Sequence, residues 1–225
     1  MKKCLEIKDE LREGLVVERA NRFAVKVLDG SRLRLCHLHD TGRLEELIFS
    51  NNAVLFVDKR RKATDCEIIA AKSRYNWVIT NSLLHRDLAL CVFQRKLNLV
   101  PEVKLYESRI DFFIPPDLYV ETKGCTLIRR GVAIFPDAPT ERGKKHLLTL
   151  MKAVESGYKA EIMFLVMSEE AKCFFPNYRT DPEFKELLFK AMRMGVKVKV
   201  PVFSLKGKTI YYLREISVCK DQPQI

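Results

Sequence analysis

The sequence predicts a two-domain protein of the α+β or α/β class, with a small all-β domain first and a mixed sheet flanked by helices second. Its 225 residues suffice for one or two domains with a hydrophobic core. Near residues 74–80 the pattern changes from closely spaced short strands to alternating helices and strands. We therefore place the first domain at residues 1–78 and the second at residues 79–225.

Six short β-rich segments make up the predicted first domain. Turn-like residues separate several of them, and no pattern typical of a long helix interrupts them. This spacing favours a small barrel or a sandwich. The segments lie at residues 14–19, 22–28, 31–38, 53–58, 65–72 and 75–80.

The second domain alternates helix-like and strand-like patterns, and capping residues mark its helices. Thr140 and Asp181 precede two helix-like patterns, and Gly157 and Gly195 follow them. The predicted order is α-β-β-β-α-β-α-β. The elements are a helix from residue 81 or 82 to about 97, strands at 101–106, 109–114 and 118–123, a helix to about 156, a strand at 160–167, a helix beginning at 182 and a strand at 196–203.

The charge balance indicates a polyanionic partner. Lys and Arg number 40 against 29 Asp and Glu, which gives a formal net charge of +11. Such a charge favours association with polyanions but does not determine the fold. DNA or another nucleic acid is the first candidate. A membrane surface, an acidic protein and a role in solubility alone are the alternatives.

The cysteines predict a reducing compartment. The seven cysteines are scattered and contain no C-x-x-C pair, a pattern that predicts neither a zinc site nor a disulfide framework. The amino terminus lacks an apolar core of signal-peptide length, and the apolar run at 162–167 is too short to span a bilayer. We expect a cytoplasmic protein without a membrane segment, and a homo-oligomer is compatible with the sequence.

A predicted hairpin over residues 109–124 carries charged groups within two otherwise apolar strands. Side chains alternate along a strand, so Glu121 and Lys123 share a face. A three-residue loop at 115–117 sets Asp111 opposite Glu121, whereas a two-residue loop breaks that register. Like charges directly opposite one another destabilise a sheet. Solvent, nearby basic groups or a bound cation must offset that cost, and a solvated surface with a Glu–Lys pair is the alternative.

An acid on the second strand and Glu-x-Lys on the third resemble the PD-(D/E)XK nuclease superfamily. There two carboxylates hold Mg²⁺ or Mn²⁺, an ion that takes oxygen ligands and retains several waters. The resemblance implies Asp111 and Glu121 as metal ligands, the Thr122 carbonyl as a further ligand and Lys123 as the catalytic lysine. In that scheme the metal activates a water, and the lysine orients this water and stabilises developing charge. Glu102 is the candidate accessory acid, preferred over an acid on the first helix.

The chain contains the stretches RANRF (19–23), HLHDTGRL (37–44), PEVKLY (101–106), SRIDF (108–112), VETKG (120–124) and FPDAPTERGKKHL (135–147). These stretches are similar to the sugar fermentation stimulation protein (SfsA) family, and the resemblance spans about residues 14–218. The family implies an amino-terminal OB-like β-barrel, a carboxy-terminal PD-(D/E)XK nuclease-like domain and DNA binding. Its name reflects a role in regulating sugar (maltose) catabolism.

The chain departs from the family pattern at a few positions. Asp40 stands where the family commonly has Asn, and Thr122 and Gly124 stand where Val and Ser are more usual. Many nucleases of the superfamily carry an acid on the first helix, and Asp87 is the acid in the helix predicted here. None of these departures falls at the predicted site residues Asp111, Glu121 and Lys123.

Basic residues predicted to contact nucleic acid come from both domains. OB barrels combine basic grooves with aromatic stacking, and helix starts attract phosphate. Accessory candidates are Asp137, Glu141 and His146, although Glu141 and Lys145 also fit a surface salt bridge and His146 fits a structural role. Tyr75 and Trp77 are expected to be packing residues. The nucleic-acid candidates are Arg32, Arg34, His37, Arg43, Arg109, Arg142 and Lys145.

Two hypotheses about function follow. The first is a metal-dependent nuclease that hydrolyses phosphodiester bonds in double- or single-stranded DNA. The second is a non-catalytic DNA-binding transcriptional regulator of sugar catabolism on a nuclease-like scaffold. An RNA target is also compatible with the sequence, and the absence of a helix-turn-helix signature weakens transcription control by that route.

Overall fold

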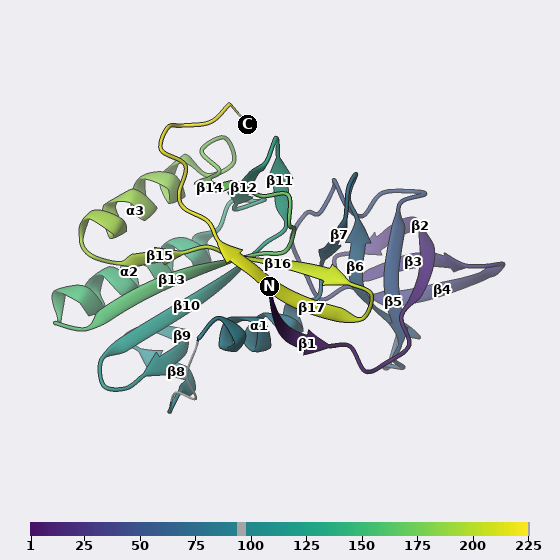
Figure 1. Cartoon of the computed structure of the whole chain (residues 1–225), viewed down its shortest axis with the longest axis horizontal. Helices are drawn as coiled ribbons and strands as arrows, with labels where there is room; N and C mark the ends of the chain where they lie inside the picture. Colours follow the sequence, from purple (N-terminus) through teal and green to yellow (C-terminus); the bar gives the residue numbers. More distant parts are fainter. Residues whose placement is uncertain (94–97, 225) are drawn as a thin grey trace.

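The computed structural model describes residues 1–93 and 98–224, in which a barrel and a helix-flanked sheet lie side by side (Figure 1). The barrel strands run in the order β4-β3-β2-β5-β6-β7, and a pairing between β4 and β6 closes β2–β6 into a barrel. The predicted all-β first domain is therefore a closed barrel. Its strands are β2 (Arg12–Asn21), β3 (Ala24–Asp29), β4 (Arg32–His37), β5 (Ala53–Asp58), β6 (Cys66–Lys72) and β7 (Trp77–Ile79).

The second layer is a mixed sheet in the order β1-β17-β16-β13-β10-β9-β8, with β15 also pairing with β13. A small sheet, β11-β12-β14, adjoins it. The strands are β1 (Lys2–Glu6), β8 (Val100–Leu105), β9 (Ser108–Ile114), β10 (Leu118–Cys125), β11 (Leu127–Arg129), β12 (Val132–Phe135), β13 (Lys159–Val166), β14 (Cys173–Pro176), β15 (Lys197–Lys199), β16 (Pro201–Lys206) and β17 (Thr209–Glu215). The helices are α1 (His85–Val92), α2 (Glu141–Glu155) and α3 (Pro182–Arg193). The predicted fold class is confirmed.

The predicted caps form the ends of the two longer helices. The Thr140 hydroxyl accepts a hydrogen bond from the Gly143 amide at 3.0 Å, and the Asp181 carboxylate accepts one from the Phe184 amide at 2.9 Å. Each bond satisfies an amide that has no partner inside the helix. Gly157, with a φ of +87°, lies in the left-handed region just beyond α2.

The structure departs from the prediction where pairing is non-local or strands are short. The first helix begins as a 3₁₀ turn (Ser82–Leu84) capped by Asn81, and α1 ends at Val92. Its predicted continuation to residue 97 falls outside the described residues. The strand predicted at 196–203 is divided at Val200 into β15 and β16. Strands β1, β11, β12, β14 and β17 were not predicted, because β1 pairs with the far end of the chain and three of the others have four residues or fewer.

One hydrophobic core runs from the barrel into the main sheet. Phe56 of β5 belongs to the same buried cluster as Phe112 of β9 and Phe203 of β16. The Ile79 amide of β7 also donates to the Met167 carbonyl at 3.3 Å, just beyond β13. Shared packing and this backbone bond fix the barrel against the main sheet.

Three disulfides overturn the prediction of unpaired cysteines. The partners lie 87, 30 and 46 residues apart, and such separations give no local sign that folding brings them together. The remaining cysteine, Cys125, is buried. Disulfides remove the support for a reducing compartment, although intracellular proteins of hyperthermophiles also carry them. Within the described ranges, no helix is long and apolar enough to cross a membrane. The bonds are Cys4–Cys91, Cys36–Cys66 and Cys173–Cys219.

Candidate functional site

The β9–β10 hairpin has the register of a three-residue loop. Ile114 pairs with Leu118 and Phe112 with Val120, so the next position along sets Asp111 beside Glu121. The backbone pairing between β9 and β10 stops there, and backbone amides donate to side-chain carboxylates instead. The Asp111 amide donates to the Glu121 carboxylate at 3.3 Å. The two acids are therefore held together where the strands part.

Asp111 is oriented by the residue between the predicted glutamate and lysine. The Thr122 amide donates to Oδ2 of Asp111 at 2.8 Å, and the Thr122 hydroxyl donates to the same oxygen at 2.6 Å. Burial, followed by the nearby charge of Glu121, raises the pKa of the Asp111 carboxyl. Oδ1 is the oxygen of Asp111 that these bonds leave for a cation, and a cation would offset the cost of the buried charge.

Glu121 lies at the centre of a buried cluster with a lysine and a histidine. Its side chain is 2% exposed, Lys123 Nζ donates to its Oε1 at 2.7 Å, and His146 Nδ1 bonds to the same oxygen. Nδ1 of His146 also lies 3.0 Å from Lys123 Nζ, so it either donates to the carboxylate or accepts from the lysine. Burial opposes ionisation of Glu121, but the bonds from His146 and Lys123 outweigh it and lower the pKa.

Asp111, Glu121, Thr122 and Lys123 line a cavity of about 560 Å³ between α1, the β8–β10 strands and the start of α2, which we term the candidate metal cavity. Asp111, Glu121 and the Thr122 carbonyl present oxygen ligands of the kind that hard divalent cations take. In the described part of the chain, no cluster of three or more acids, histidines or cysteines could hold a metal ion. A cation here would thus retain several water ligands, as Mg²⁺ does in many sites.

Glu102, the predicted accessory acid, reaches the mouth of this cavity. Pro101 pairs with Phe112 and Val103 with Ile110, so Glu102 stands opposite Asp111 on the neighbouring strand. Its carboxylate forms an ion pair with Arg109 at 3.3 Å, and both side chains are 71% exposed. Glu102 lines the cavity but faces solvent and Arg109 rather than joining the buried cluster.

His85 also lines this cavity and was not predicted. The structure leaves Asp87 exposed and outside the cavity lining, whereas the ring of His85 packs against Gly124. A Cβ atom at Gly124 would lie 2.3 Å from Cε1 of His85, so a glycine is required for this packing. Burial lowers the pKa of His85 to about 4. The glycine that replaces the usual serine was the sequence signal for this contact.

The start of α2 contributes one cation to the cavity. Arg142 is exposed and lines the cavity, whereas Lys145 is exposed and lies outside it. Glu141 pairs with Lys144 at 2.7 Å rather than with Lys145 as its spacing predicted. His146, one turn further along, is buried against Glu121.

Asp137 lies outside the metal cavity. Its carboxylate accepts a hydrogen bond from the Arg43 amide at 2.7 Å and thereby joins the barrel to the loop before α2. Asp40 accepts a bond from the Gly42 amide at 2.9 Å in the same barrel loop. Both acids line an adjacent pocket of about 280 Å³. Asp137 therefore contributes to the junction rather than to the metal cavity.

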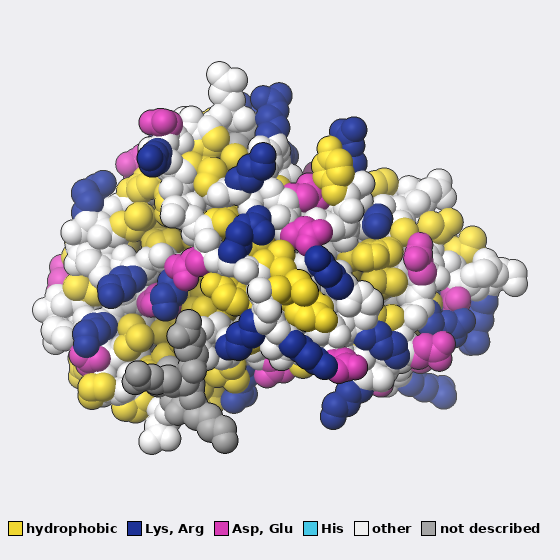
Figure 2. All heavy atoms as spheres, viewed as in Figure 1, with side chains coloured by type: hydrophobic (Ala, Val, Ile, Leu, Met, Phe, Trp, Pro, Cys, Tyr) yellow, Lys and Arg dark blue, Asp and Glu magenta, His cyan; other side chains and the backbone are white. Residues whose placement is uncertain are grey.

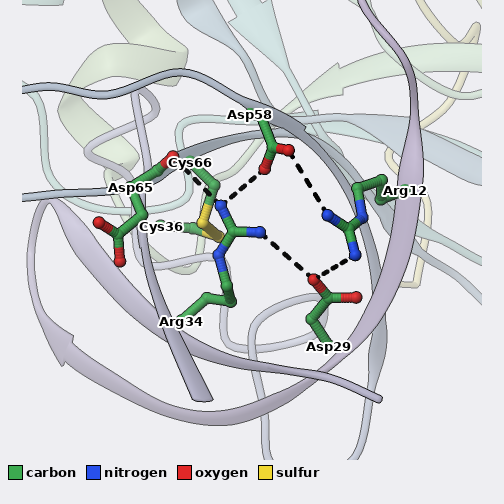
Figure 3. Close-up of a disulfide and its surroundings, with 7 residues drawn as sticks. All are labelled: Arg12, Asp29, Arg34, Cys36, Asp58, Asp65 and Cys66. Carbon is green, nitrogen blue, oxygen red and sulfur yellow. Dashed lines mark hydrogen bonds and ion pairs between the residues drawn. A yellow bond between two sulfur atoms is a disulfide. The ribbon is translucent and has the colours of Figure 1, made fainter. Parts of the chain in front are cut away.

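Arg34, predicted to contact phosphate, is instead the buried member of an ion-pair network whose other arginine, Arg12, is half-buried and whose Asp58 is exposed. It is 6% exposed and donates to Asp58 at 2.6 Å and Asp29 at 3.3 Å, and Arg12 also pairs with both acids (Figure 3). The Cys36–Cys66 disulfide lies beside this network. Two carboxylates already neutralise Arg34, so it has no free edge for phosphate.

The other barrel candidates remain accessible. Arg32 and Arg43 are exposed. The His37 ring lies parallel to that of the half-exposed Phe23, with 6.5 Å between centroids, and Arg22 stands 5.9 Å from the Phe23 ring. Burial, followed by the charges of neighbouring groups, lowers the pKa of His37. A cation beside exposed aromatic rings is an arrangement that OB barrels use for bases.

Comparisons with known proteins find similarity across both parts of the chain. The model of the SfsA N-terminal OB domain matches residues 17–80, and that of the sugar fermentation stimulation protein RE domain matches residues 75–209. A sugar fermentation stimulation protein homolog of Saccharolobus solfataricus is 43% identical, over 96% of this chain and 88% of that protein. The homolog of Sulfurisphaera tokodaii is 44% identical, over 93% and 91%.

A solved structure has the same overall fold. The structure of Pyrococcus furiosus SfsA in complex with Ca²⁺ superposes with a TM-score of 0.89 at 25% sequence identity. The match covers 97% of this chain and 99% of that one. The barrel and the main sheet are thus arranged in the same way in both proteins.

Proposed function

The chain belongs to the sugar fermentation stimulation protein (SfsA) family, and on that premise we propose that it binds DNA and hydrolyses phosphodiester bonds with a divalent metal ion. The observation that carries the proposal is the pair Asp111 and Glu121, adjacent in one cavity with Lys123. The structure of the Pyrococcus furiosus relative in complex with Ca²⁺ supports a divalent cation in this family. Ca²⁺ and Mg²⁺ both take oxygen ligands.

Each residue has a distinct part in the proposed reaction. Asp111, Glu121 and the Thr122 carbonyl would hold Mg²⁺ or Mn²⁺, which when bound supplies an activated water and neutralises charge on the phosphate. Thr122 fixes one oxygen of Asp111 and leaves the other free. Lys123 Nζ, held 2.7 Å from Glu121, places a positive charge where charge develops on the phosphate. His146 holds the same oxygen of Glu121 that Lys123 contacts.

DNA binding is supported by exposed cations at the cavity and elsewhere in both domains. Arg142 lines the cavity at the start of α2, where the helix dipole also favours an anion. Arg109, Arg32 and Arg43 add exposed cations, and the whole chain carries a formal charge of +11. A single- or double-stranded backbone can meet these groups, with affinity that falls as salt rises.

One observation favours a second candidate, a non-catalytic DNA-binding regulator of sugar catabolism. Oε1 of Glu121 is already bonded to both Lys123 and His146, so a metal must compete with two protein donors for that atom. A scaffold that keeps these bonds would bind DNA without cleaving it.

Cleavage assays distinguish the two candidates. Labelled single- and double-stranded DNA and RNA are incubated with Mg²⁺, Mn²⁺ or EDTA, using the native chain, Asp111→Ala, Lys123→Ala and Lys104→Ala. Lys104 is an exposed lysine on β8 that does not line the cavity and serves as the matched control. If the chain is a nuclease, we expect metal-dependent cleavage that both site variants lose and the control retains. DNA binding without cleavage of any substrate would instead support the regulator.

A further inference from the structure

A groove of about 630 Å³ lies at the junction of the barrel and the second domain, outside the candidate metal cavity. Its walls come from the β6–β7 turn, the β11–β12 turn and the segment before β14. We term it the junction groove and define it by the residues that can contact nucleic acid. These are Arg74, Tyr75, Arg130 and Lys172.

The junction groove continues into an arginine-rich pocket. Arg130 also lines a neighbouring pocket of about 720 Å³ together with Arg129 and Arg179. Figure 2 shows Lys and Arg side chains projecting at the β11–β12 end of the molecule. Guanidinium groups bind phosphate through several N–H donors, which makes a row of arginines suited to a nucleic-acid backbone.

The cations of this surface are available to a ligand. All five are exposed, and none forms an ion pair with a residue in the described ranges 1–93 and 98–224. Two carboxylates, Glu46 and Glu170, also line the groove, and Glu170 accepts a hydrogen bond from Ser73 at 2.8 Å. The surface therefore carries an excess of positive charge, unlike the neutralised Arg34 network. The five cations are Arg74, Arg129, Arg130, Lys172 and Arg179.

Tyr75 adds an aromatic platform and was wrongly predicted to be a packing residue. It is 66% exposed, with Arg74 5.2 Å from its ring. Its turn is held in place because the Ser73 hydroxyl accepts from the Tyr75 amide at 3.3 Å and donates to Glu170 across the junction. An exposed ring on a fixed turn beside unpaired cations suits stacking of a nucleobase.

Shared lining residues connect the groove with the metal cavity. The metal cavity and the 280 Å³ pocket share four residues, including His85 and Gly124, and that pocket shares Thr126 with the junction groove. Asp137, which accepts the hydrogen bond from the Arg43 amide, is one of the residues that line the small pocket. A nucleobase can stack on the exposed Tyr75 ring only where it is not already stacked inside a duplex, which favours a single strand.

We propose that the substrate is a single strand, or the single-stranded arm of a larger nucleic acid, that runs from the metal cavity along the domain junction and is held by the junction groove. The backbone lies against Arg130, Lys172 and the neighbouring arginines, and a base stacks on Tyr75. This inference rests on the proposed nuclease function for what happens in the metal cavity, but binding in the groove can be measured separately.

The test measures binding of labelled single strands and duplexes by fluorescence anisotropy in EDTA, at several salt concentrations and with DNA and RNA arms. The first variant is Arg130→Gln/Lys172→Gln. Its matched control is Lys190→Gln/Arg193→Gln, which removes the same charge from exposed positions on α3. Two lost contacts should reduce the slope of log affinity against log salt by about 1.4 for a single strand. The control should keep the native slope.

The second variant pair tests stacking. Tyr75→Ala should weaken single-strand binding by roughly 5- to 150-fold, the range for loss of one base–aromatic stack, while Tyr75→Phe should retain it. Circular dichroism confirms folding of each variant. Duplex affinity should change no more than in the control. A preference for the DNA or the RNA arm identifies the sugar of the strand.

The outcomes separate this inference from the proposed nuclease. Groove variants that lose single-strand binding support the groove, even if the native chain cleaves no substrate and the nuclease proposal fails. Groove variants that bind single strands like the control overturn the inference, even if metal-dependent cleavage by the native chain is intact. Equal losses for single strands and duplexes also overturn it, because the groove would then serve as a general basic surface.

Discussion

The Cys4–Cys91 disulfide provides a sharp test of the fold, because it joins β1 to α1 across 87 residues of chain. Both cysteines are half-buried, so replacing them by serine removes little packing and mainly releases the cross-link. In the chain-entropy treatment a loop of this length lowers the stability of the unfolded state by about 4.5 kcal/mol at 25 °C. We expect Cys4→Ser/Cys91→Ser to lose a stabilisation of that order.

Urea unfolding without reductant measures this loss, and a thermal melt should show a midpoint lower by roughly 9–18 °C for a chain of this size. Cys173→Ser/Cys219→Ser is the matched comparison, since its bond closes a shorter loop of 46 residues and should cost about 4 kcal/mol. Thiol titration of the denatured native chain should find one thiol, that of Cys125. Seven titratable thiols, or unchanged stability in both variants, would refute the reasoning.

Three further predictions use urea unfolding. Gly124→Ala should lower the free energy of unfolding by about 1–3 kcal/mol, because its Cβ would lie 2.3 Å from His85. Adding His85→Ala to that variant should restore part of the lost stability, and losses that simply add would contradict the contact. The pKa of buried Glu67 is lowered from 4.5 to about 2, so its contribution of about 3 kcal/mol to the free energy of unfolding is present above pH 4.5 and lost as pH falls through 2. The difference in unfolding free energy between the native chain and Glu67→Gln should therefore shrink over that window, and a constant difference would contradict the prediction. Thr140→Ala removes the cap on the Gly143 amide and should cost about 1 kcal/mol, whereas an unchanged midpoint would show that the cap is dispensable.

Local sequence signals predicted most of the fold. The caps at Thr140 and Asp181 depend on a few neighbouring residues, so the capping residues and the local helical pattern were enough to predict α2 and α3. The three-residue loop, one of the two alternatives for this hairpin, gives the observed register from Ile114–Leu118 to Phe112–Val120, and Asp111 lies beside Glu121 just beyond it. Signals of this kind are complete within one short stretch of chain.

Features that depend on residues far apart in the chain could not be predicted from the sequence. The disulfides join residues 30 to 87 positions apart, and β1 pairs with β17 near the other end of the chain. No periodicity in the sequence indicates such contacts. Arg34 was predicted to contact phosphate from its residue type, but in the structure it pairs with two acids on other strands. His85 lines the candidate metal cavity because Gly124 on β10 leaves room for its ring, and the glycine in place of the usual serine is the one sequence signal for that contact.

Calorimetric titration of Mn²⁺ into the native chain, Asp111→Asn and Glu102→Gln tests the central claim most directly. The account predicts one site per chain that disappears in Asp111→Asn, because that change removes a carboxylate oxygen facing the cavity. Glu102→Gln should keep the site, since Glu102 is directed toward Arg109 and solvent. Absence of binding to the native chain, or equal binding to Asp111→Asn, would contradict a metal centre at the Asp111–Glu121 pair.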